Sequence, residues 1–157
     1  MIGRLAIHSH QQRVDAVFAR AASVSDDAET LADFARYLCI LVAGFVEKSF
    51  SEIMLEHSRQ CGSRSLQRYV ERNTNKFTNA NAEKILQLLG SFDPDWRVRM
   101  EEFLVDDKKA AIDSIYGLRN NIAHGIPTGL TSARVMQYYD SAKKVIEFAQ
   151  DLCIPET

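Results

Sequence analysis

Apolar residues recur at intervals of three and four along almost the whole chain, a periodicity typical of amphipathic α-helices. Glycine and proline, which interrupt helices, number only seven and three in 157 residues. No segment gives a convincing strand. The pattern therefore predicts an all-α fold, a compact bundle of about five to seven helices.

The first two predicted helices are long. The first is expected from about Arg4 to Ala22, with an apolar side made of Leu5, Val14, Val17, Phe18 and Ala21. The polar segment SVSDDAE then provides a capping break, and the second helix is expected from near Asp27 to about Ser58. The middle of this second helix, YLCILVAGFV, is apolar on every side, which predicts that it is the buried central helix of the bundle.

Shorter helices follow. RSLQRYVERNTNKF predicts a short helix that gives way to the asparagine-rich segment NTNKFTNAN, and AEKILQLLGSF predicts the next helix. DPDWRVRMEEFL predicts another, with Asp93 as its cap and Pro94 in its first turn. A further helix is expected from about Asp107 to Asn121, ended by Gly125 and Pro127. The last helix opens at Thr131 and carries the most regular apolar series, Val135, Tyr138, Ala142, Val145, Ala149 and Leu152.

Length and composition fit one soluble globular domain over residues 1–157. Apolar residues make up 46% of the chain and charged residues 25%, close to the average for such proteins. The formal net charge is −2, so a nucleic-acid-binding role would need a local basic patch.

Three widely spaced cysteines, Cys39, Cys61 and Cys153, favour neither a disulfide framework nor a structural zinc site, and a reducing compartment fits them best. The first residues do not have the pattern of a secretory signal, and the longest apolar run is about half the length of a membrane span. We therefore expect a cytoplasmic protein without a membrane segment.

The stretch GLRNNIAHGIP, residues 117–127, concentrates candidate chemistry at the end of a helix. Arg119 and His124 would lie about 140° apart on a regular helix, but a helix that loosens around Asn121 to Ala123 would let both enter one cleft. Histidine moves protons near neutral pH and arginine binds phosphate, a combination that suits cleavage of RNA without a metal or cofactor. Alternatively, both residues could simply stabilise the helix C-terminus.

The segment LRNNIAHG resembles the R-polar-x3-H signature of the HEPN superfamily, small α-helical domains many of which are metal-independent ribonucleases. It is most similar to the RiboL-PSP-HEPN branch, and the likeness extends in helix order over roughly residues 30–152. The resemblance implies that His124 is the acid–base group, Arg119 the phosphate clamp and Asn120 a polar group that positions the phosphate.

The same resemblance implies a homodimer in which two motifs face each other across a composite active site. It further implies an endoribonuclease that leaves a 2′,3′-cyclic phosphate and a 5′-hydroxyl. Such domains often act as toxins or antiviral defence effectors, so a cognate antitoxin or regulatory protein is a possible partner beside RNA. The alternative is a non-catalytic helical module that binds RNA, a nucleotide or a protein.

Other polar residues have a functional and a structural interpretation each. Glu47 could orient Arg119 through a charge-assisted pair, or could emerge at the solvent edge of its helix. Four basic residues at intervals of four could guide RNA or form a solvated helix face: Arg64, Arg68, Arg72 and Lys76. His8 and His10 point to different sides of a helix and predict no metal site, while His57 and Trp96 are expected to be structural.

Overall fold

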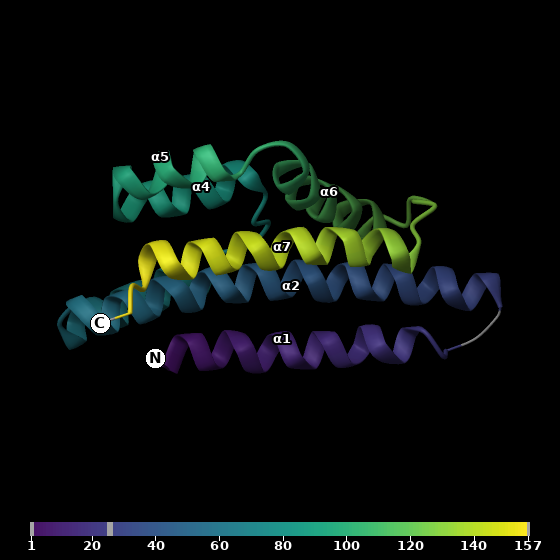
Figure 1. The fold of residues 1–157 in the computed structure, drawn as a ribbon, viewed down its shortest axis with the longest axis horizontal. Helices are drawn as coiled ribbons and strands as arrows, with labels where there is room; N and C mark the ends of the chain where they lie inside the picture. The colour runs from purple at the N-terminus through teal and green to yellow at the C-terminus, as the bar shows by residue number, and fades with distance from the viewer. Residues whose placement is uncertain (1, 25–26, 157) are drawn as a thin grey trace.

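The computed structural model describes residues 2–24 and 27–156, and these residues form seven α-helices and no strand. The all-α prediction is thus confirmed (Figure 1). Ser25 and Asp26, in the predicted capping break, lie outside the described residues. The helices are α1 (Ile2–Ala21), α2 (Ala28–Cys61), α3 (Arg64–Thr74), α4 (Ala82–Phe92), α5 (Pro94–Phe103), α6 (Asp106–Ala123) and α7 (Ser132–Cys153).

Helix α2 is the centre of the bundle, as its apolar middle predicts. It packs against α1, α3, α6 and α7, and Figure 1 shows it lying between α1 and α7. Leu38, Val42, Phe45 and Phe50 are fully buried along it. Burial of this much apolar surface is the main force that holds the other helices around α2.

Side-chain caps set several helix boundaries. Asp93 accepts a hydrogen bond from the backbone N–H of Asp95 (2.9 Å), with Pro94 in the first turn of α5 as predicted. Thr131 caps α7 in the same way. Such caps satisfy N–H groups that have no partner within the helix, so they fix where each helix starts.

Two predicted apolar faces differ from the observed ones. Leu5 is 68% exposed, because α1 instead buries the side that carries Gly3, Ile7, Val14 and Phe18. On α7, Tyr138 is only partly buried, whereas the neighbouring Tyr139 is buried and donates its hydroxyl to Asp15 on α1 (2.6 Å). In each helix one residue of the predicted apolar stripe is thus less buried than predicted.

The contacts of His57 and Trp96 are structural, as predicted. The His57 ring lies edge-on to Trp96, with 4.6 Å between ring centroids, and its Nδ1 lies 3.0 Å from the Cys153 carbonyl oxygen. These contacts join α2 to α5 and to the end of α7. The three cysteines are free thiols.

No helix in the described ranges is both long enough and apolar enough to cross a membrane.

Candidate active site

The candidate motif lies at the C-terminal end of α6. This helix is regular to Ala123, and the next residue, His124, still donates its backbone N–H to the Asn120 carbonyl oxygen (3.1 Å). Gly125 then adopts φ +68°, a left-handed conformation that glycine accepts at little cost. The predicted loosening around Asn121 to Ala123 is therefore wrong, because the chain leaves the helix only at its cap.

Arg119 lies on the side of α6 that packs against α2, where it forms an ion pair with Glu47. The two side chains are 27% and 13% exposed. The Arg119 guanidinium also lies over the ring of Tyr116, 5.1 Å from the ring centroid. Arg119 is therefore held by a carboxylate and an aromatic face, while part of its surface remains accessible.

Two groups near this ion pair, the Tyr116 phenol and the Cys39 thiol, are neutral near pH 7. Burial raises the pKa of the Tyr116 phenol, the charge of Glu47 raises it further, and the hydroxyl donates to the Ala43 carbonyl oxygen (2.9 Å). Burial also raises the pKa of the Cys39 thiol to about 11, although the charge of Arg119 opposes the shift. Neither group therefore competes with Glu47 for the Arg119 guanidinium.

His124 is exposed, and within the described part of the chain its side chain makes no hydrogen bond or ring contact. On a regular helix its position lies about 140° from that of Arg119, on the face shared by Gly117 and Asn120. One chain thus places Arg119 against α2 and His124 toward solvent. It does not bring the two onto one face.

A hollow of about 710 Å³ lies beside Asn120. Its lining includes Gly117 and Asp113 of α6, together with Asn79 and Asn81 from the start of α4 and the preceding loop. The Asp113 carboxylate accepts the backbone N–H of Ala82 (2.9 Å), which fastens the start of α4 to α6. This hollow is not predicted from the sequence, where its one signal is the asparagine-rich segment NTNKFTNAN.

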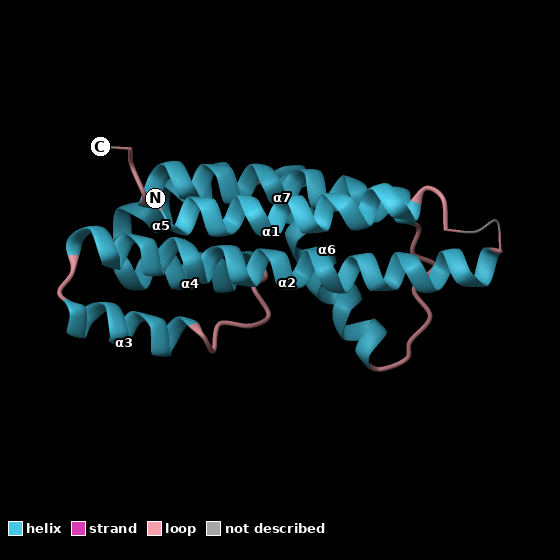
Figure 2. Ribbon diagram, turned by 90° about the horizontal axis from the view of Figure 1, so that it is seen from below, coloured by secondary structure: helices cyan, strands magenta, loops and turns pink. Residues whose placement is uncertain are grey.

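Helix α3 carries three of the four basic residues that were predicted to form a stripe: Arg64, Arg68 and Arg72. Lys76 lies beyond the end of that helix, so the prediction of one helical stripe is wrong at its last member. Arg68, Arg72 and Lys76 still line one hollow of about 630 Å³ with Tyr69, which is 66% exposed. Figure 2 shows α3 and the C-terminal end of α6 on the same side of α2 but toward different ends, so the basic hollow is separate from the motif.

Comparison with known proteins gives one family match. The family model described as RiboL-PSP-HEPN matches residues 9–154, which is nearly the whole chain. No curated protein and no solved structure matches the chain.

Proposed function

The chain belongs to the RiboL-PSP-HEPN family, and from this premise we propose that it is a metal-independent endoribonuclease. The ribose 2′-hydroxyl attacks the adjacent phosphorus and the 5′-oxygen leaves, giving a 2′,3′-cyclic phosphate and a 5′-hydroxyl. The attacking oxygen loses a proton, the leaving oxygen gains one, and negative charge builds on the phosphate. The reaction thus needs a proton-transfer group and a cation, and the motif contains both residue types.

His124 is the proposed proton-transfer group, and its exposure leaves the imidazole accessible to a strand of RNA. General acid–base catalysis by one residue contributes roughly a hundred- to ten-thousandfold in rate. Asn120, exposed one turn earlier on α6, is proposed to position the phosphate or its neighbours.

The observation that carries the proposal is the way Arg119 is held. Glu47 and the Tyr116 ring fix the guanidinium, but a guanidinium has five N–H donors and Glu47 does not occupy them all. The remaining donors suit the oxygens of a phosphate as its charge increases. A fixed orientation matters because a clamp that is already ordered loses little entropy when substrate binds.

We further propose that the active site is composite and is completed in a homodimer. Arg119 and His124 lie on different faces of α6, so a second copy can supply the partner that one chain does not. Ile40 lies two turns before Glu47 on the same face of α2 and is 46% exposed, and Ile126, just after the motif, is 49% exposed. A second copy that covers these two side chains would bring its own motif to the site.

The basic hollow of α3 is proposed to guide the RNA strand. Its arginines suit phosphates, and its exposed Tyr69 ring suits stacking of an unpaired base. In the cell, a ribonuclease of this kind would act as a toxin or defence effector restrained by a cognate antitoxin or regulatory protein.

The Arg119–Glu47 ion pair also fits a second candidate function, a non-catalytic module that binds RNA or a nucleotide. In such a module the pair would only tie α6 to α2, since Glu47 already balances the charge of Arg119. Incubation of RNA with the wild-type protein, His124→Ala and Arg119→Ala, in excess chelator, distinguishes the two. Loss of cleavage in both variants supports the enzyme, and equal cleavage by all three proteins contradicts it.

A further inference from the structure

A smaller pocket of about 290 Å³ lies between α1 and α2, separate from the hollow beside Asn120. Figure 1 shows the two helices running side by side. The polar lining comes from Ser9, His10 and Arg13 of α1 and from Lys48, Ser49 and Glu52 of α2.

Ser49 gives this pocket a buried polar group without a partner. Its side chain is 1% exposed, and its Oγ makes no hydrogen bond to any described residue. A serine within a helix can donate to a carbonyl oxygen three or four residues earlier, but Ser49 does not. Buried hydroxyls without a partner are rare because the lost hydrogen bond with water is not replaced. Ser49 therefore leaves an unpaired hydroxyl in the wall of the pocket.

The charge at the pocket mouth is positive. Arg13 and Lys48 are both exposed, and Arg13 also donates a hydrogen bond to the Ser9 hydroxyl (3.0 Å). Burial lowers the pKa of His10, and the charges of Arg13 and Lys48, which line the same pocket, lower it further. Two cations, hydroxyl groups and a largely neutral imidazole make a set of donors suited to an anion.

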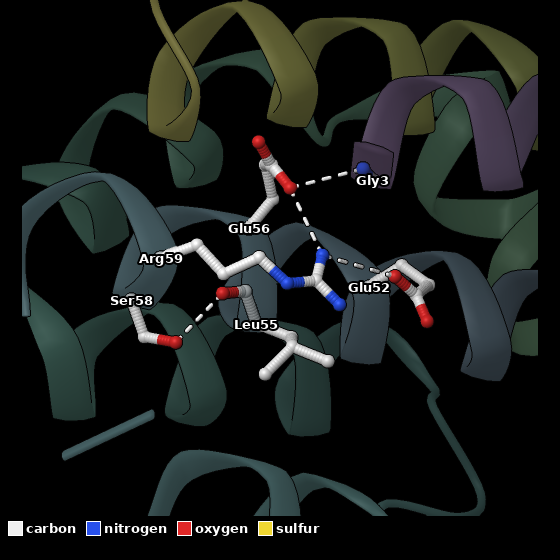
Figure 3. A network of polar contacts seen from close by, with 6 residues as sticks. All are labelled: Gly3, Glu52, Leu55, Glu56, Ser58 and Arg59. Atoms are coloured by element: carbon white, nitrogen blue, oxygen red, sulfur yellow. Dashed lines mark hydrogen bonds and ion pairs between the residues drawn. The ribbon is translucent and has the colours of Figure 1, made fainter. Parts of the chain in front are cut away.

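Glu52 is the opposing charge in the pocket, and a neighbouring arginine partly balances it. Figure 3 shows the Arg59 guanidinium between Glu52 and Glu56. Its Nη1 lies 3.8 Å from Glu52 Oε2 and 2.9 Å from Glu56 Oε2. Glu56 also accepts the backbone N–H of Gly3 (3.0 Å), which holds the start of α1 against α2. The two walls of the pocket are thus fixed relative to each other, and its net charge is positive.

We propose that the pocket between α1 and α2 binds a phosphate group. Arg13 and Lys48 would neutralise the charge of the phosphate, and the Ser49 hydroxyl would donate to one of its oxygens. Lys48 directly follows Glu47 in the sequence, but the pocket lies on the side of α2 that faces α1, whereas Glu47 meets Arg119 on the side that faces α6. Assigning this phosphate to an RNA strand rests on the proposed function.

Titration with inorganic phosphate tests the pocket by itself. In the full chain with labelled histidines, we expect the ring resonances of His10 to shift with saturation. Ser49→Ala and Arg13→Ala should weaken this binding about tenfold each, the effect of losing one hydrogen bond to a charged group. Arg20→Ala is the matched control, because it removes an exposed arginine from the same helix that does not line the pocket. Absence of a saturable shift at His10, or equal affinity in all variants, would overturn the phosphate site.

Binding of an RNA strand tests the assignment to RNA. A labelled RNA whose 2′-hydroxyls are all methylated cannot be cleaved, so its affinity is independent of catalysis. Lys48→Ala should weaken its binding about tenfold and reduce the slope of log affinity against log salt by about 0.7, the value for one lost phosphate contact to a single strand. Unchanged RNA affinity in Lys48→Ala and Ser49→Ala would overturn the assignment to RNA. If the variants weaken RNA binding as expected but the wild-type protein cleaves no RNA, the result contradicts the proposed ribonuclease activity and supports phosphate binding in the pocket.

Discussion

Glu47 of α2 and Arg119 of α6 form an ion pair that joins the central helix to the helix carrying the candidate motif. Both side chains are largely shielded from solvent, and Tyr116 packs against the guanidinium from its own helix. This relationship gives the arginine a fixed place, and it makes Glu47 the residue through which α2 can influence the chemistry of α6.

Glu47→Gln is expected to lower RNA cleavage about tenfold while the protein stays folded. The amide keeps the shape of the carboxylate but not its charge, so the guanidinium is held less firmly and its charge is left partly buried without an opposite charge, at a cost of about 1–3 kcal/mol. Cleavage rates and the free energy of unfolding of both proteins should be measured at the same pH.

Arg119→Lys, compared with Glu47→Gln, shows whether the ion pair acts by positioning the guanidinium for cleavage or only by stabilising the folded protein. Lysine keeps the charge but lacks the planar fork that binds phosphate through two donors, so this variant should lose cleavage more than stability. If Glu47→Gln lowers the stability but leaves the cleavage rate unchanged, Glu47 has only a structural role.

Gly125→Ala is expected to destabilise the protein by about 1–2 kcal/mol, since alanine disfavours the left-handed conformation that Gly125 adopts at φ +68°. An added Cβ would meet no atom within 4 Å there, so backbone strain is the only cost. Gly117→Ala is the matched control: its Cβ also meets no atom, but its helical conformation predicts a gain of about 0.5–1 kcal/mol. Chemical denaturation measures both, and equal effects would contradict the account of the helix end.

Glu56 should make stability depend on pH in the acidic range. Burial acts to raise the pKa of this carboxyl, but hydrogen bonds, among them those from the Gly3 N–H and Arg59, outweigh it and lower the pKa to about 2. The folded state thus favours the ionised form, so the contribution is present above the ordinary value near 4.5 and is lost as the pH falls toward 2.

The size of this contribution is on the order of 3 kcal/mol. Glu56→Gln should therefore be less stable than wild type at pH 6, and the two should converge as the pH falls toward 2. Denaturation at a series of pH values measures the difference, and a constant difference over this range would contradict the assignment.

Mixing two inactive variants tests the composite site. If His124 of one copy works with Arg119 of the other, His124→Ala and Arg119→Ala should each be inactive alone. An equimolar mixture that exchanges subunits should recover about a quarter of wild-type cleavage, because half of the dimers are mixed and each contains one intact site. No recovery, with subunit exchange verified, would count against sites that combine residues of two chains.

Much of the fold follows from local sequence signals. The helix AEKILQLLGSF spans Ala82–Phe92 as predicted, and the caps Asp93 and Thr131 are recognisable as residue types. The second helix runs to Cys61 rather than Ser58, since nothing before Gly62 breaks its pattern. The exposure of Leu5 was not predictable, because the close approach of α1 to α2 at Gly3 decides which face is buried; a Cβ there would lie 2.6 Å from that of Glu56.

The candidate site was predictable as a motif but not as an arrangement. The resemblance to the family signature identifies Arg119 and His124, but the side of α6 that faces α2 depends on tertiary packing. Asn79 lines the hollow beside Asn120 from a loop in which its backbone adopts φ +56°. The pocket at Ser49 is formed between two helices, and the apolar periodicity of each helix alone does not predict which residues of the two will meet.

The proposed reaction is cleavage of RNA by attack of the 2′-hydroxyl, with His124 and Arg119 as the acting residues. Its most direct test is an oligonucleotide of deoxynucleotides with a single ribonucleotide, incubated with protein in excess chelator and followed by mass spectrometry. We expect one cut, after the ribonucleotide, giving a 2′,3′-cyclic phosphate and a 5′-hydroxyl, and we expect no product from His124→Ala or Arg119→Ala. Cleavage of the all-deoxy strand, or equal product from all three proteins, would contradict the proposed reaction.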